Sequence, residues 1–201
     1  MPDVSFRYNA IQLYDLGFGP RMVSVTPPDC VIAPTSKIRA KDRGKAPGYL
    51  TASGWTGCDV NDLKWRCHDY ATAKLWEEWD ANVGFVVGDG YVVVDNDQGA
   101  EFSRILQRLM PNSLRRFVAD PKHERDAFLL RVVDFVGDPV EVANRELKFR
   151  NGVRTATVQI LARGKQAVIA GIHPGTKSPY VWERELPEFN QIPRKPTRGF
   201  V

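Results

Sequence analysis

Two aspartates that follow an apolar strand have the clearest chemical potential in this chain. Residues 91–97 read YVVVDND, which places Asp95 and Asp97 two positions apart. Side chains at this spacing on a strand share one face and lie about 6–7 Å apart along the backbone. Two such carboxylates repel each other unless a cation lies between them. The pair predicts a divalent-metal site suited to phosphate chemistry, and a polar turn at the strand end is the alternative.

A histidine in a turn rich in Gly and Pro forms the second candidate group. Residues 170–182 read AGIHPGTKSPYVW, with His173 and Lys177 inside the turn. A histidine can donate to a phosphate oxygen, and a nearby lysine adds positive charge. We expect both residues to bind nucleotide, although a histidine that only caps the turn has the same pattern.

Basic residues elsewhere add candidates for binding phosphate. Lys122, Arg125 and Arg131 lie in or near the run KHERD at 122–126 and could bind a triphosphate or a template backbone. Lys45 lies in GKAPG at 44–48 and could contact DNA. GKAPG is not a phosphate-binding P-loop, because its spacing differs and no Ser or Thr follows the lysine. A solvated loop and a structural turn are the respective alternatives.

The cysteines give weaker signals. There are three, at positions 30, 58 and 67, an odd number without a CxxC motif, so a disulfide framework is not expected. Cys58, Cys67 and His68 could supply zinc ligands, but their spacing fits no common zinc pattern. Ordinary thiols are the favoured interpretation.

The elements that must position these residues can be predicted from periodicity and turn residues. We expect helices over 10–14, 70–80 with Asp69 as the N-cap, and 98–110. Strands are expected at 22–25, 83–87, 91–95, 114–118, 127–133, 155–161, 165–170 and 180–182. The turn GDG at 88–90 predicts a tight hairpin, 35–57 a long surface loop, and 134–152 a polar segment with a short helix. Together these predict an α+β fold with a mostly antiparallel sheet.

Composition is that of a globular protein. Of the 201 residues, 43% are hydrophobic and 26% charged, which is ordinary for a folded domain with a substantial core. No apolar run approaches the roughly 20 residues needed to span a bilayer, and no signal peptide is evident, so we expect a cytoplasmic protein with no membrane partner. The net charge of +4 permits nucleic acid binding without requiring it.

The order of these motifs resembles the bifunctional DNA primase/polymerase (prim-pol) domain of the archaeo-eukaryotic primase superfamily. The resemblance rests on GKAPG, then ANVGFVVG at 81–88, then VVVDND, then GIHP and PYVW at 171–182. It covers about residues 15–185. It implies a catalytic fold with an RRM-like sheet, helices and a small αβ unit in residues 1–185, followed by a proline-containing tail or linker at 186–201 toward a possible helicase domain.

The family's motifs imply roles for particular residues. The acidic pair that binds catalytic metal maps onto Asp95 and Asp97. The Ser-x-His motif that contacts nucleotide phosphates is expected in or just before 127–131, where this chain has no such histidine in register; His123 is close but out of register. Lys122, Arg125 and Arg131 are the nearby cations that could substitute.

The family's third acidic position maps onto Gln159. An amide offers one neutral oxygen, a weaker ligand for a hard cation than a carboxylate. A third ligand could come from elsewhere, such as Glu141 or Glu146, two carboxylates could suffice, or catalysis could be weakened.

The resemblance implies template-directed nucleotidyl transfer with two Mg²⁺ or Mn²⁺ ions, acting as DNA primase, DNA polymerase or both. The expected partners are a DNA template and primer and (deoxy)nucleoside triphosphates, in the replication of a phage or plasmid. The alternative is a weakened or inactive module of the same fold that binds single-stranded DNA or a nucleotide.

Overall fold

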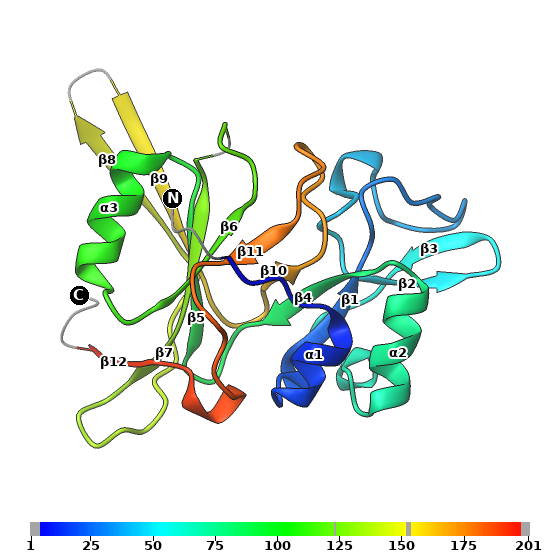
Figure 1. The fold of residues 1–201 in the computed structure, drawn as a ribbon, viewed down its shortest axis with the longest axis horizontal. Helices are drawn as coiled ribbons and strands as arrows, with labels where there is room; N and C mark the ends of the chain where they lie inside the picture. The colour runs from blue at the N-terminus through cyan, green and yellow to red at the C-terminus, as the bar shows by residue number, and fades with distance from the viewer. Residues whose placement is uncertain (1–4, 123, 152–153, 198–201) are drawn as a thin grey trace.

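The computed structural model describes residues 5–122, 124–151 and 154–197. Figure 1 shows two β-sheets side by side, with helix α3 on the outer face of the larger sheet and helices α1 and α2 beside the smaller one. The helices are α1 (Ala10–Asp15), α2 (Tyr70–Glu78) and α3 (Ala100–Leu109), with single 3₁₀ turns at Gly19–Arg21, Ala40–Asp42, Leu63–Trp65 and Phe189–Gln191. The predicted α+β class with mostly antiparallel pairing is confirmed.

The larger sheet carries the acidic pair at the end of its central strand, β5. Within the described residues its order is β11-β6-β7-β5-β9-β8, with β12 parallel to β7 and all other pairs antiparallel. The strands are β5 (Tyr91–Asn96), β6 (Leu114–Val118), β7 (Asp126–Val133), β8 (Arg145–Asn151), β9 (Arg154–Leu161), β11 (Tyr180–Trp182) and β12 (Arg194–Pro196).

The smaller sheet has the order β1-β4-β10 in the described part of the chain, with antiparallel pairs throughout. Its strands are β1 (Met22–Val25), β4 (Asn82–Val86) and β10 (Gln166–Ala170). A separate hairpin consists of β2 (Gly48–Thr51) and β3 (Gly54–Gly57). β10 and β11 are joined by the turn at 171–179, so this turn connects the two sheets.

Side-chain alternation on β5 divides the core in two. Val92 and Val94 pack toward α3 in a cluster that includes Leu106, whereas Tyr91 and Val93 pack toward the smaller sheet. Successive side chains of a strand point to opposite faces, so Asp95 follows Val93 toward the smaller sheet. The carboxylate therefore faces the space between the sheets.

The predicted hairpin at 83–95 is wrong. β4 and β5 belong to different sheets, and only an isolated bridge, Gly88 to Tyr91, closes the turn between them. Gly88 and Gly90 have positive φ values of 129° and 83°, which glycine adopts at little cost. The prediction of a tight turn at 88–90 is therefore correct, although the strands on either side do not pair. The turn redirects the chain from one sheet to the other.

Two other expectations differ from the structure. The segment 134–152 contains strand β8, which lengthens the sheet beyond β9, instead of a short helix. The supposed loop at 35–57 includes the β2–β3 hairpin. β2 and β3 contain Gly48, Gly54 and Gly57, and β8 consists mostly of polar residues, so neither segment has the apolar pattern by which strands are found.

The C-terminal segment packs against the domain in its described part. Leu186 and Ile192 are buried in the main core, Phe189 stacks on Tyr91 with ring centroids 5.0 Å apart, and β12 pairs with β7. This differs from the extended linker that we predicted for 186–201, because its few apolar residues cover the edge of the core. Whether a further domain follows stays a prediction.

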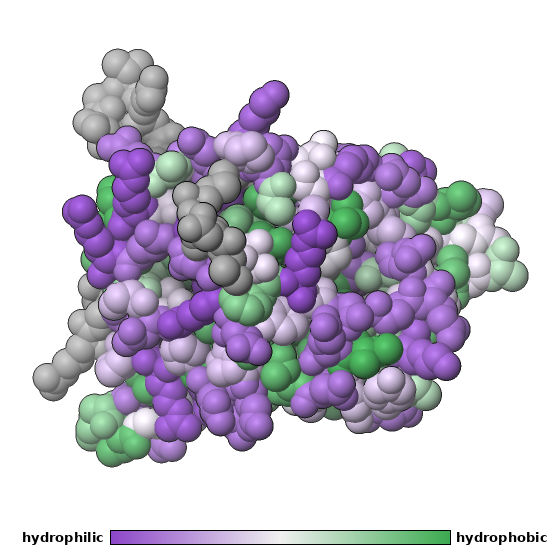
Figure 2. All heavy atoms as spheres, viewed as in Figure 1, coloured by the Kyte–Doolittle hydropathy of each residue, from purple (hydrophilic) through white to green (hydrophobic). Residues whose placement is uncertain are grey.

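The face of the molecule drawn in Figure 2 is mostly hydrophilic, with hydrophobic residues in small groups between the polar ones. None of the helices that the structure describes has the length and apolar character needed to cross a membrane.

If the segment after β11 is part of the folded unit, Ile192→Ala should lower the free energy of unfolding by about 2–5 kcal/mol, the usual cost of emptying a buried aliphatic site. Ile192 is 2% exposed. Urea unfolding followed by circular dichroism measures the change. Leu63→Ala, at a side chain that is 68% exposed, is the control and should shift stability by about 0.5 kcal/mol or less. Equal effects of the two substitutions would contradict the packing.

Candidate active site

A row of polar side chains crosses the larger sheet at the level of Asp95. In the strand register Asp95 lies directly between Ala127 on β7 and Gln159 on β9. The row continues to Arg116 on β6 at one end and Glu146 on β8 at the other. Residues directly opposite each other on paired strands share a face. The sheet therefore presents a cation, a carboxylate, an amide and a second carboxylate on its inner face.

Arg116 reaches Asp95 across a small residue. Its Nη2 lies 4.0 Å from Asp95 Oδ1, and Ala127, between them in the row, leaves room for the guanidinium. Nη1 donates to the Val168 carbonyl, and the guanidinium carbon lies 4.5 Å from the ring centroid of Tyr180. These contacts hold the cation beside the carboxylate with only 12% of its side chain exposed.

Sequence reasoning missed Arg116. The signal was its position between Leu114 and Val118, which are both buried. In a strand these three residues share one face, so a cation at the middle position must face the interior side of the sheet.

Asp97 lies just beyond the end of β5 and pairs with Arg125. The Arg125 Nη1 to Asp97 Oδ1 distance is 3.2 Å, and the side chains are 55% and 47% exposed. An ion pair this exposed contributes little to stability, about 0–1 kcal/mol. Both groups can therefore exchange this contact for a ligand at small cost.

A hollow of about 150 Å³ is lined by both aspartates together with Arg116, Arg125, Lys45 and His173. Burial raises the pKa of Asp95, and the charge of Asp97 adds to this, whereas Arg116 and, more weakly, Lys45 and Arg125 lower it. The side chain of Asp95 is still 33% exposed, through the opening of the hollow. The hollow thus brings the two carboxylates together with cations from several segments of the chain.

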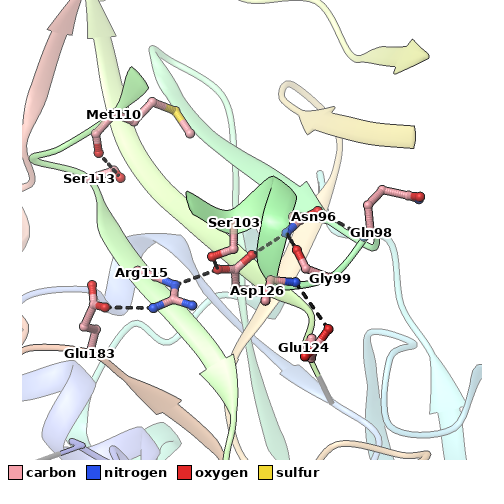
Figure 3. Close-up of polar contacts among 11 residues, drawn as sticks. Asn96, Gln98, Gly99, Ser103, Met110, Ser113, Arg115, Glu124, Asp126 and Glu183 are labelled. Atoms are coloured by element: carbon pink, nitrogen blue, oxygen red, sulfur yellow. Dashed lines mark hydrogen bonds and ion pairs between the residues drawn. The ribbon is translucent and has the colours of Figure 1, made fainter. Parts of the chain in front are cut away.

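Asn96, between the two aspartates, is anchored on the other side of the sheet (Figure 3). Its Nδ2 donates to Asp126 Oδ1 over 2.8 Å, and its Oδ1 accepts the N–H of Gln98 over 3.0 Å. Asp126 also accepts from Ser103 Oγ and from Arg115 Nε. This network holds Asn96, between the two aspartates, and the backbone of Gln98, which follows Asp97.

A single asparagine ties together the two segments that bring Lys45 and His173 to the hollow. The buried Asn82 donates from Nδ2 to the carbonyls of Gly44 (3.1 Å) and Ile172 (2.9 Å), and its Oδ1 accepts the Ile172 N–H (2.7 Å). Each bonded residue immediately precedes a lining cation or histidine. Figure 1 shows the segment between β1 and β2 beside the loop between β10 and β11.

The ring of His173 is oriented within its own turn. Its Nδ1 accepts the Thr176 N–H over 3.2 Å, and the ring meets Tyr180 edge-on at 5.6 Å between centroids. With Nδ1 as the acceptor, a neutral ring carries its proton on Nε2, which can donate to an anion.

Comparison with known protein families shows which family this chain belongs to. Residues 24–196 match the family described as bifunctional DNA primase/polymerase, N-terminal. The chain belongs to the prim-pol family. A search of the curated proteins returned no match. Members of the family act on DNA and nucleotides and are typically metal-dependent.

Three cations that we expected at the nucleotide site of this prim-pol domain lie elsewhere. Lys122 is exposed outside the lining of the hollow. Arg131 lies opposite Tyr91, four residues along β5 from Asp95, and its guanidinium packs over that ring. Lys177 pairs with Asp29 in a separate hollow of about 740 Å³ behind the turn. None of the three lines the hollow, and a nucleotide-binding role for them stays a prediction; His123 lies outside the described residues.

The alternative acidic ligands are separated by the fold. Glu141 accepts the N–H of Asp89, at the opposite end of β5 from the pair. Glu146 lies in the row of Asp95 but two strands away, about 10 Å at the usual strand spacing. Gln159 is therefore the nearest of the three to Asp95.

Few protein side chains at this site are available to bind a metal ion. In the described parts of the chain, no three or more His, Cys, Asp or Glu residues, Cys58, Cys67 and His68 included, lie together as a group that could hold a metal ion. Asp95, Asp97 and the Gln159 amide offer oxygen ligands only. This set fits Mg²⁺ or Mn²⁺, because Mg²⁺ is commonly held by one or two carboxylates and completes its shell with water and substrate phosphates.

The raised pKa of Asp95 predicts a pH-dependent stability cost. In the unfolded chain the carboxyl ionises near its usual pKa of about 4, so between that value and the raised pKa the native state binds more protons, and stability falls as pH rises. Asp95→Asn should therefore raise the free energy of unfolding near neutral pH and leave it unchanged below the usual carboxyl pKa.

Urea unfolding across this pH range measures the effect. Asp15→Asn, at an exposed position on α1, is the control and should retain the pH profile of the unmodified protein. A loss of stability at neutral pH in Asp95→Asn would contradict the prediction.

Proposed function

We propose that this chain is a template-directed nucleotidyltransferase, a DNA primase, a DNA polymerase or both. The observation that carries the proposal is the acidic pair at the end of β5, facing a hollow into which four other segments bring Lys45, Arg116, Arg125 and His173. Carboxylates that can hold metal, next to cations that can hold phosphate, are the arrangement that phosphoryl transfer needs.

In the proposed reaction, a 3′-hydroxyl oxygen attacks the α-phosphorus of a nucleoside triphosphate. A new P–O bond forms, the bond to the β-phosphate oxygen breaks, and pyrophosphate leaves with its electron pair. The hydroxyl proton passes to solvent or to a nearby base. The protein's task is to position the two substrates and to offset negative charge.

Each lining residue has a part that suits its position. Asp95, Asp97 and Gln159 would hold the divalent ions, which when bound lower the pKa of the attacking hydroxyl and neutralise charge on the triphosphate. Arg125 can exchange Asp97 for phosphate oxygens because their pair is exposed. His173 donates from Nε2, and Lys45 extends over the same hollow. Arg116 stays beside Asp95 and offsets its charge.

The wider setting is part of the proposal. Prim-pol chemistry would serve the replication of a phage or plasmid, with a helicase domain or subunit as partner, and with the catalytic domain formed by residues 1–185 and the packed segment that follows. This activity is expected in the cytoplasm.

Gln159 favours a second candidate function. It lies directly opposite Asp95. The family resemblance implies a third carboxylate at this position. With a neutral ligand there, the domain could bind single-stranded DNA or a nucleotide and catalyse poorly or not at all.

Asp95→Asn and Asp97→Asn should each lower metal-dependent primer extension by about a hundredfold or more, because each removes a charged ligand without changing shape. The assay supplies primed or unprimed template, dNTPs or NTPs, and Mg²⁺ or Mn²⁺. Product from unprimed template identifies a primase, and product from primed template alone identifies a polymerase.

Asp15→Asn is the matched control and should extend primers normally. Undiminished extension by either active-site variant would overturn the site. Binding of DNA without synthesis by the unmodified protein would favour the second candidate function.

Gln159→Glu should raise the extension rate or the affinity for Mg²⁺ on the order of tenfold if the amide weakens the metal site. Titration of extension against Mg²⁺ separates the two effects. Gln191→Glu, at an exposed position, controls for the added charge and should change neither. A loss of activity in Gln159→Glu would show instead that the site requires the amide.

A further inference from the structure

The positive charge of this chain is concentrated in one short segment. Residues 37–45 read KIRAKDRGK, with five cations and one carboxylate. Their formal charge of +4 equals that of the whole chain, so the remaining residues are balanced. Lys37, Arg39, Lys41 and Lys45 are exposed. A local field of this kind attracts polyanions more effectively than the same charge spread over the surface.

This basic segment forms one wall of a hollow of about 760 Å³. The lining also includes Thr35 and, at the end of β3 and just after it, Thr56 and Cys58. Lys45 lines this hollow and also the smaller one that contains Asp95 and Asp97. The two hollows are therefore neighbours with one shared lysine between them.

The wall is held in place before any ligand binds. Gly44 N–H donates to Thr26 Oγ1 over 3.1 Å, Thr26 N–H donates to the Ala46 carbonyl over 2.9 Å, and Gln166 Nε2 donates to the Lys45 carbonyl over 2.7 Å. Ile38 packs closely against Gly48 and Gly57 of the hairpin. A surface that is already ordered loses little conformational entropy on binding.

The hollow is lined by two lysines, Lys37 and Lys45, and by two aspartates, Asp42 and Asp59. The charge of Asp42 is paired with Arg39, whereas Asp59 accepts hydrogen bonds from the neutral Asn61. In contrast, within the described residues the ammonium groups of Lys37 and Lys45 have no hydrogen-bond or ion-pair partner. Two lysines are thus available to an incoming anion.

We propose that this hollow and the basic segment 37–45 form the path of a single DNA strand toward the acidic pair, with Lys37 and Lys45 contacting successive phosphates. Naming that strand the template rests on the proposed function. The hollow has room for a short stretch of one strand, whereas a duplex needs a much wider surface. Thr35 and Thr56 add hydroxyl donors, and the apolar surface of Ile38 and Pro47 suits a base or sugar.

Binding is tested without metal or nucleotide, so that the result does not depend on catalysis. Lys37→Glu should weaken the affinity for a fluorescein-labelled oligothymidine about tenfold in fluorescence anisotropy. It should also reduce the slope of log affinity against log salt by about 0.7, the loss of one phosphate contact on a single strand. Lys74→Glu, at an exposed lysine on α2, is the matched control and should change the affinity less than about twofold.

A second variant has the opposite expected sign. Asp42→Asn removes a negative charge from the hollow and releases Arg39, so it should tighten binding of the same oligothymidine by about two- to threefold. Circular dichroism establishes that each variant is folded.

Equal binding by Lys37→Glu, Lys74→Glu and the unmodified protein would overturn the path. So would a change confined to the KM for dNTPs, which would assign the hollow to the triphosphate. Weaker DNA binding by Lys37→Glu in a protein that extends no primer would support the strand path while the proposed function fails. Normal extension with unchanged DNA binding would leave the proposed function standing and the path disproved.

Discussion

The bond between Asn96 and Asp126 decides which way the acidic pair faces. Asn96 is fully buried on the α3 side of the sheet, where it donates to Asp126. Because side chains alternate along a strand, its neighbours Asp95 and Asp97 must then turn toward the smaller sheet. A slip of one residue would bury both carboxylates against α3 and expose the amide to the hollow. The internal partners of Asp126, Ser103 and Arg115, make that slip costly.

The site is built from residues of both sheets and lies where the two sheets meet. The larger sheet supplies the row of Arg116, Asp95 and Gln159, while the loops around the smaller sheet supply Lys45 and His173. Asn82, the first residue of β4, bonds to both loops at once, so both loops are held in place relative to β4. The cations and carboxylates that line the hollow are thereby held at fixed positions before substrate or metal binds.

Local signals predicted most elements but not their partners. The strand at 114–118 and the N-cap Asp69 were predictable because each depends on neighbouring residues. The hairpin at 83–95 was wrong because a turn motif describes the turn and not where the strands pair afterwards. Strand β8 was missed because a strand at the edge of a sheet needs no apolar repeat. Pairing is a non-local property, and a single sequence carries little information about it.

The sequence by itself determined the carboxylates, their i, i+2 spacing, and the motif order that places this chain in the prim-pol family, because these depend only on residue type and local geometry. Tertiary structure alone decided the rest of the site. It brought Arg116 across Ala127 to Asp95, aligned Gln159 opposite, and left Lys122, Arg131 and Lys177 out of the lining of the hollow. The physical reason is register: which residues become neighbours depends on how strands far apart in the chain align, and that alignment is set by the packing of the whole core.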